Sequence, residues 1–146
     1  MSSAVKVFFR MVQDEDGYPP IEVESVWALK RDDGYEIDNI PFYVKEVAVG
    51  DIVSAKPDVD GCLWYTGLVR AGGHSTIQIM FSNKEDVQPV RDVLKQMGCD
   101  SEGSDLPRLI AVNVPSTVPY EDVKAYLDEC QRAGKLEYQE ACIGFL

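Results

Sequence analysis

The hydrophobic period of the sequence changes near residue 74, and this change constrains the fold more than any other feature. Before it, apolar residues alternate in short runs between turn residues, as they do in β-strands. After it, alternating runs are separated by two segments whose apolar residues recur every three or four positions, as on one face of a helix. The 146 residues therefore divide into a β-rich part, 1–73, and an α+β part, 74–146. Because no Pro/Gly/Ser-rich linker separates the two parts, we expect them to pack together.

The β-rich part is expected to hold short strands joined by turns of Asp, Gly and Pro. In residues 21–30, apolar positions alternate with Glu22 and Glu24, which predicts a strand with both glutamates on a solvent-exposed face. Gly50-Asp51 precedes a hairpin that turns at residues 57–61. The spacing predicts a small curled antiparallel sheet or an SH3-like barrel. The expected strands cover residues 4–12, 21–30, 34–44 with its pairing broken at Asn39 and Pro41, a run from Ile52, and 63–70.

The second part has the order β-α-β-β-α-β, which predicts a ferredoxin-like unit packed on the first part. Ser82 followed by Glu85 forms a capping box and predicts a helix start at Ser82. Pro89 lies inside this helix, so its first turn is expected to be separate or kinked. Ser116 or Thr117 is expected to cap the second helix. The apolar stripes are Val87, Val90, Leu94 and Met97 in the first helix, and Tyr120, Val123, Leu127 and Cys130 in the second. The expected strands are 75–81, an edge strand or loop at 99–107, 108–115, and 136–145.

The net charge restricts the class of partner. The chain has 25 acidic and 14 basic residues and a formal charge of -11. This charge repels nucleic-acid phosphates and anionic membranes and favours a basic protein partner. No run approaches the length of a membrane span and no signal peptide is recognisable, so a cytoplasmic protein is expected, as a monomer or weak dimer. Phosphate-binding glycine motifs are missing, and no cofactor is expected.

The cysteines and acidic loops do not predict a metal site. Cys62, Cys99, Cys130 and Cys142 are far apart and form no CxxC pair. In the reducing cytoplasm we expect them to be free thiols. The loops that begin at Asp14 and Asp58 resemble calcium loops at first sight, but both lack the required oxygen ligands at later positions.

His74 is the only histidine of the chain, and two interpretations are open. It is a candidate general base, with Cys62 as nucleophile and Asp51 as the orienting acid. The negative charge of the chain disfavours a thiolate, however. We favour the second interpretation, in which Gly72 and Gly73 supply positive φ angles for a tight connection and His74 bonds locally at a strand end.

Three acidic turns are candidates for partner binding, because turns of successive hairpins can cluster at one end of a small sheet. Carboxylates beside Tyr18, Tyr35 or Tyr43 would combine charge steering with aromatic contact area. The candidate carboxylates are those of Asp14, Glu15, Asp16, Asp32, Asp33, Asp58 and Asp60.

The pattern GYEIDNIPFY, then Gly50-Asp51, then GGHST resembles an uncharacterised bacterial family of small proteins, a domain of unknown function. The resemblance extends over roughly residues 5–145 and makes Tyr35, Asn39, Phe42 and His74 a candidate functional loop. Small acidic bacterial proteins of this sort are often immunity partners of secreted toxins. The resemblance therefore implies an immunity protein that neutralises a toxin domain by occluding its active or target-binding surface. The alternative is a small hydrolase or transferase that uses His74.

Overall fold

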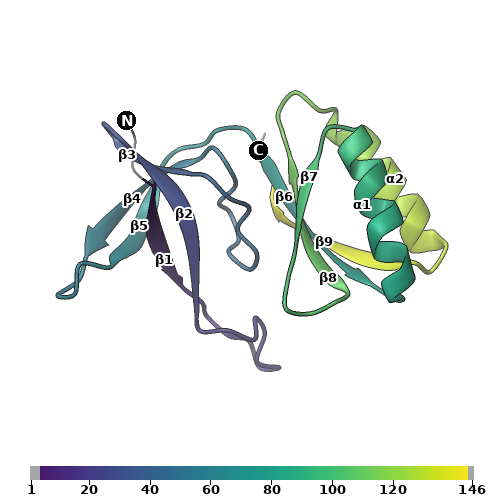
Figure 1. The fold of residues 1–146 in the computed structure, drawn as a ribbon, viewed down its shortest axis with the longest axis horizontal. Coiled ribbons are helices and arrows are strands. Elements are labelled where there is room, and N and C mark those ends of the chain that lie inside the picture. Colours follow the sequence, from purple (N-terminus) through teal and green to yellow (C-terminus); the bar gives the residue numbers. More distant parts are fainter. Residues whose placement is uncertain (1–3, 145–146) are drawn as a thin grey trace.

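The computed structural model describes residues 4–144 and shows an α+β protein with two parts (Figure 1). The first part is a closed barrel in which neighbouring strands are antiparallel, except that β1 and β5 are parallel. Its strands are β1 (Ala4–Arg10), β2 (Val23–Arg31), β3 (Gly34–Ile37), β4 (Ile52–Pro57) and β5 (Leu63–Arg70). The contact that closes the barrel is short, because β1 and β5 pair only at Val7–Leu63 and Phe8–Trp64 in the described chain.

The second part is a four-stranded antiparallel sheet in the order β7-β8-β6-β9. Its strands are β6 (Ser75–Phe81), β7 (Asp100–Gly103), β8 (Leu109–Val114) and β9 (Leu136–Cys142). A single 3₁₀ turn, η1 (Lys84–Asp86), leads into helix α1 (Val87–Gln96), and α2 (Tyr120–Arg132) joins β8 to β9. Both helices cover one face of the sheet, and its other face is turned toward the barrel (Figure 1).

The helices cover one face of the second sheet and the barrel covers the other, so β6 is buried along nearly its whole length. Ile77, Ile79 and Phe81 pack with the helices in the main core. On the opposite face, Thr76 and Gln78 are also buried, at 0% and 4% exposure, although they are polar. The strand at 75–81 is thus confirmed by the structure, with its polar residues placed in the junction between the two parts.

In β2 the predicted inner and outer faces are reversed. Glu24 is buried together with Val26 and Ala28, whereas Val23 and Trp27 are 40% and 48% exposed. The carboxylate of Glu24 is stable inside the protein because backbone N–H groups surround it. The prediction of a solvent-exposed face that holds Glu24 is therefore wrong.

Both helices begin later than predicted. The residues after Ser82 form the 3₁₀ turn rather than an α-helix, and the cap position of α1 makes no side-chain hydrogen bond. Pro89 is the third residue of α1, in the first turn, where a backbone N–H has no partner within the helix and proline is tolerated. The second helix starts after Pro119, so neither Ser116 nor Thr117 is its cap.

The remaining elements agree with the predictions apart from their ends. The hairpin of β4 and β5 forms, and residues 100–103 are an edge strand. The predicted strand over 4–12 ends at Arg10, and β3 ends at Ile37, before the predicted break at Asn39 and Pro41. Residues 1–3 and 145–146 lie outside the described residues. They include the outer ends of the two predicted parts and the last residue of the strand predicted over 136–145.

Gly72 lies in the connection between β5 and β6 and leaves no room for a side chain. A Cβ at this position would lie 2.6 Å from the carbonyl oxygen of Gly50. Because the clash involves backbone on both sides, we expect Gly72→Ala to lower the free energy of unfolding by about 2 kcal/mol, a fall in Tm of about 6 °C. Thermal unfolding followed by circular dichroism measures this effect.

Gly67→Ala is the matched control, because its Cβ would meet only Ser54 Oγ, at 3.7 Å. We expect its Tm to stay within about 2 °C of the wild type. Equal stability of the two variants would contradict the contact between Gly72 and Gly50.

Candidate functional site

The β3–β4 loop, residues 38–51, lies between the barrel and the second sheet (Figure 1). Its first half wraps around the buried carboxylate of Glu24 on β2. The backbone N–H groups of Phe42, Tyr43 and Val44 donate to this carboxylate at 2.6, 2.9 and 2.9 Å. Hydrogen bonds to an ionised acceptor are stronger than neutral ones. Glu24 therefore sets the course of this half of the loop.

A second buried carboxylate, Asp51, holds the other end of the loop. Its Oδ2 accepts the N–H of Ala48 at 2.9 Å, and its Oδ1 accepts the N–H of Gly72 at 2.8 Å. Asp51 is 3% exposed. It therefore joins the loop to the β5–β6 connection, next to the close contact between Gly50 and Gly72.

Gln78 of β6 attaches the loop to the second sheet. Its side-chain amide donates to the carbonyl oxygen of Phe42 and accepts the hydroxyl of Tyr18 at 3.0 Å. Farther along the loop, the N–H of Glu46 donates to the carbonyl oxygen of Ala141 at 3.0 Å. Gln78 and the carbonyl group of Ala141 thus attach the loop to the second sheet. Different segments of the loop line two concave surfaces.

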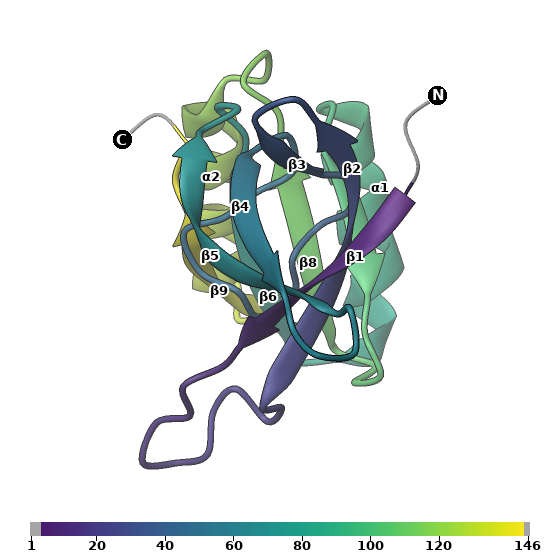
Figure 2. The same cartoon turned by 90° about the vertical axis from the view of Figure 1, so that its left-hand side faces the viewer.

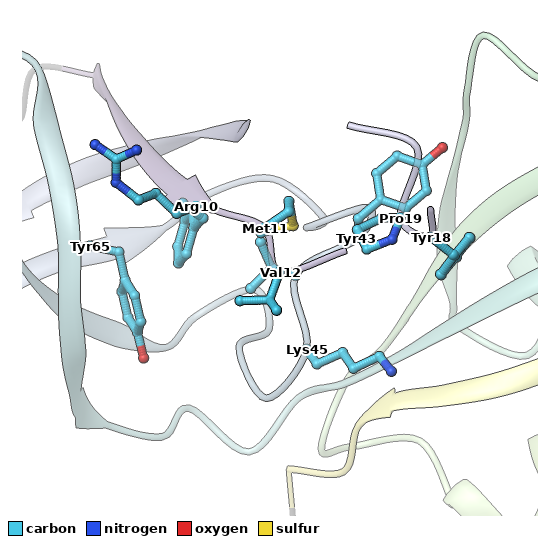
Figure 3. Close-up of a pocket in the computed structure, with 10 residues that line it drawn as sticks. Arg10, Met11, Val12, Tyr18, Pro19, Tyr43, Lys45 and Tyr65 are labelled. Carbon is cyan, nitrogen blue, oxygen red and sulfur yellow. The ribbon is translucent and has the colours of Figure 1, made fainter. Parts of the chain in front are cut away.

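The first concave surface, which we call the tyrosine groove, has a volume of about 290 Å³ (Figure 3). At one end the ring of Tyr65 stacks on Phe9 with a centroid distance of 4.7 Å. At the other end the rings of Tyr18 and Tyr43 meet edge to face at 6.0 Å. None of the described residues that line the groove is acidic, and two are basic. The lining residues are Phe9, Arg10, Met11, Val12, Tyr18, Pro19, Tyr43, Val44, Lys45 and Tyr65.

The second concave surface, which we call the anionic crevice, has a volume of about 330 Å³ between the start of the loop and the edge of the second sheet. Three of its lining residues carry carboxylates, and none of its described lining residues is basic. Partial burial, together with the nearby Glu24, raises the pKa of Glu102, while hydrogen bonds from Ile40 and Asn39 and the positive charge of Arg91 oppose this shift. The lining residues are Asp38, Asn39, Ile40, Val49, Asp100, Ser101, Glu102 and Asn113.

His74 lies next to the anionic crevice but bonds across the sheet rather than locally. Its Nδ1 is 3.0 Å from the Nδ2 of Asn113 on β8, a residue that is 5% exposed. The oxygen of the same amide is 3.3 Å from Nδ1, so His74 and Asn113 are joined through this ring nitrogen. Gly73 has a positive φ of 89° at the connection, as predicted, whereas Gly72 does not have a positive φ, so that half of the prediction is wrong. The predicted turn is present, and the local bond of His74 is corrected to a long-range one.

The structure does not assemble the trio of Cys62, His74 and Asp51. The turn that holds Cys62 and the β5–β6 connection that holds His74 lie at different ends of the barrel (Figure 1). Both carboxylate oxygens of Asp51 accept backbone N–H groups. Burial, with nearby carboxylates, raises the pKa of Cys142 to about 11, which keeps that thiol protonated. A hydrolase or transferase that uses His74 stays a prediction.

The other residues of the predicted functional loop have structural contacts. Asn39 accepts the backbone N–H of Trp27 at 2.5 Å, and Phe42 contributes its backbone to Glu24 and Gln78. Tyr35 packs half-buried against the barrel core. Of the predicted loop residues, Asn39 lines the anionic crevice and His74 borders it through Asn113.

The three acidic turns do not converge. The β1–β2 loop and the β2–β3 turn lie at opposite ends of the barrel (Figure 2). Asp14 and Asp58 accept backbone N–H groups of their own turns, and Asp33 pairs with Arg70 at 2.5 Å. The other four candidates are exposed side chains of these separate turns: Glu15, Asp16, Asp32 and Asp60.

Two other properties concern membranes and metals. Neither α1 nor α2, the α-helices of residues 4–144, has the length and apolar character of a membrane-spanning helix. In the same residues, no group of three or more His, Cys, Asp or Glu side chains is arranged to hold a metal ion.

Sequence reasoning missed the carboxylates that matter most to this site. The alternation of β2 predicts a solvent-exposed Glu24, and the pattern around Asp51 predicts a strand start and a catalytic role but not a buried carboxylate that holds a loop. Asp38 lies within the pattern GYEIDNIPFY, directly before Asn39. Asp100 and Glu102 lie in residues 99–107, for which the sequence predicts an edge strand or a loop. The density of acids in that short segment was the available signal, but it does not show that the segment faces Asp38.

The comparisons with known proteins agree with this description. Residues 24–138 match the family described as a domain of unknown function, DUF4265. A solved structure, a hypothetical protein from Neisseria gonorrhoeae, is similar with a TM-score of 0.74 and 22% identity over 100% of this chain and 98% of that chain. At this identity the likeness shows a shared fold. No curated protein matches the sequence. The chain belongs to the DUF4265 family, which confirms the expected membership of an uncharacterised family.

Proposed function

We propose that the protein is a cytoplasmic binding protein that works as an immunity protein and neutralises a bacterial toxin by occluding a basic surface of the toxin domain. The observation that carries this proposal is the anionic crevice, where Asp38, Asp100 and Glu102 line one cavity without a basic residue among its described lining. These acids replace the three separate turns as the proposed contact surface.

Electrostatics supports such a contact at two ranges. A net charge of -11 attracts a basic partner from solution and raises the rate of encounter. At short range, a crevice of about 330 Å³ is at the lower end of the size of ligand pockets. It therefore accommodates side chains such as those of Arg or Lys rather than a folded element. The carboxylates of Asp38, Asp100 and Glu102 offer the acceptors that a guanidinium requires.

We also propose a more specific description of the fold. We infer that the barrel is SH3-like and that the second part is ferredoxin-like. The closed five-stranded barrel supports the first inference. The order β7-β8-β6-β9, with both helices on one face, supports the second.

The test reverses the charges of the crevice. We expect Asp38→Lys, Asp100→Lys and Glu102→Lys together to weaken binding of a hexa-arginine peptide at least about ten-fold, measured by calorimetry at low salt. The same variant is expected to lose protection of cells that produce the toxin encoded by the neighbouring gene. Because the pKa of Glu102 is raised, this carboxyl takes up a proton at a higher pH than an ordinary glutamate. Affinity should therefore begin to fall, as the pH is lowered, at a higher pH than it would with an ordinary glutamate in this position.

The matched control makes the same change in charge outside the crevice, with Glu15→Lys, Asp16→Lys and Asp60→Lys on the exposed turns. We expect it to keep most of the affinity and the protection. If the crevice variant protects cells as well as the wild type, or if the control loses as much binding, the crevice is not the contact surface.

A further inference from the structure

The tyrosine groove lies where β1 and β5 separate. These strands pair at two positions and then run apart toward their C-terminal ends (Figure 2). In the described chain, β5 from Tyr65 to Arg70 pairs with β4 alone, so its other edge has no strand beside it. Leu68 and Val69 on this stretch are each 47% exposed. An unpaired edge with apolar side chains is a template for an additional strand.

The shape of the groove suits an extended ligand. Tyr65 lies at one end, Tyr18 and Tyr43 lie together at the other, and Met11 and Val12 are between them (Figure 3). Aromatic side chains at both ends provide large contact areas. Because each of these side chains has only two χ angles, fixing it on binding costs little conformational entropy. A segment that spans the groove would therefore place side chains against both aromatic ends.

The charge of the groove is opposite to that of the chain. Arg10 and Lys45 flank it, and no carboxylate belongs to its described lining. The guanidinium of Arg10 lies over the ring of Trp64 at 4.4 Å from the centroid. A cation–π contact uses the face of the guanidinium and leaves N–H donors at its rim. Two cations in a groove whose described lining has no acidic residue, in a chain of net charge -11, favour an acidic ligand.

The tyrosine hydroxyls add hydrogen-bond donors. Tyr18 donates to Gln78, whereas within residues 4–144 the hydroxyls of Tyr43 and Tyr65 make no hydrogen bond. Burial raises the pKa of both phenols, and nearby carboxylates raise them further. Both groups therefore stay protonated at neutral pH and can donate to a carboxylate of the ligand.

We propose that the tyrosine groove binds an extended, acidic segment of a partner protein, which adds a strand to the free edge of β5 and places its carboxylates between Arg10 and Lys45. This site shares no lining residue with the anionic crevice and does not depend on the proposed function. A single-stranded nucleic acid is also anionic, but it has no backbone N–H and C=O pattern that continues a sheet.

The probe is a fluorescein-labelled peptide of sequence Glu-Phe-Glu-Val-Asp-Phe-Glu-Val, titrated by fluorescence anisotropy against the full chain. We expect binding that weakens with added salt, and none by the same peptide with lysine in place of each acid. Arg10→Glu with Lys45→Glu should weaken binding at least about ten-fold. Tyr43→Phe with Tyr65→Phe keeps the rings and removes the donors, and should weaken it about three- to ten-fold.

The matched control is Lys6→Glu with Lys30→Glu, which makes the same change in charge on β1 and β2 outside the groove. We expect it to change affinity by less than about three-fold, with the Tm of every variant measured to confirm folding. The crevice variant should bind the peptide as the wild type does, which separates the two proposals. The absence of peptide binding, an equal loss in the control, or tighter binding of an oligo-dT strand than of the peptide would overturn the inference.

Discussion

Replacing Glu24 with alanine is expected to lower the free energy of unfolding by about 4 kcal/mol. The change leaves three backbone N–H groups, those of residues 42–44, without their acceptor in a buried position. Each unsatisfied buried donor costs roughly 1–3 kcal/mol, and relaxation toward solvent recovers a part of this sum. Urea unfolding measures the loss as a lower midpoint at an unchanged m-value.

Glu22→Ala is the control, because Glu22 is an exposed glutamate two residues away. We expect a change within about 0.5 kcal/mol. Glu24→Gln should remain destabilising, because the amide oxygen accepts whereas the NH₂ group faces a donor. A loss at Glu24 no larger than that at Glu22 would show that the carboxylate does not organise the loop.

Asp51→Ala is expected to cost about 3 kcal/mol through the same mechanism at the other end of the loop. Two charge-assisted hydrogen bonds are lost, from the N–H groups of Ala48 and Gly72, each worth roughly 1.5–3 kcal/mol before relaxation. Because these bonds tie the loop to the β5–β6 connection, we also expect faster amide hydrogen exchange at Ala48 and Gly72.

Asp38→Ala is the control on the same loop, since Asp38 is exposed and lines the anionic crevice. It should leave both the stability and the exchange of Ala48 unchanged. Unaltered exchange at Ala48 and Gly72 in Asp51→Ala would contradict the assignment of Asp51 as the residue that holds this end of the loop.

Local patterns predicted most of the elements. Ile77, Ile79 and Phe81 alternate as a strand does, and Val90 and Leu94 face the core from one side of α1. The turn at Gly73 follows from the freedom of glycine to adopt a positive φ. Each of these elements depends on residues close in sequence, so the sequence alone is sufficient to predict it.

Local patterns failed where a distant group supplied the deciding interaction. The capping box at Ser82 was locally reasonable, yet no cap hydrogen bond forms and α1 begins at Val87. His74 bonds to Asn113 on another strand. The acidic turns are on separate sides of the barrel, and the carboxylates that share a cavity come from segments about sixty residues apart.

The sequence by itself determined the division near residue 74, the order of strands and helices, and the excess of negative charge, because periodicity and composition are properties of the chain. The tertiary structure decided which face of β2 is buried and where charges gather. A glutamate is stable inside the barrel only when backbone donors from another segment satisfy it, and the fold alone brings residues 42–44 to Glu24. The same loop placement separates a cationic groove from an anionic crevice in one acidic chain.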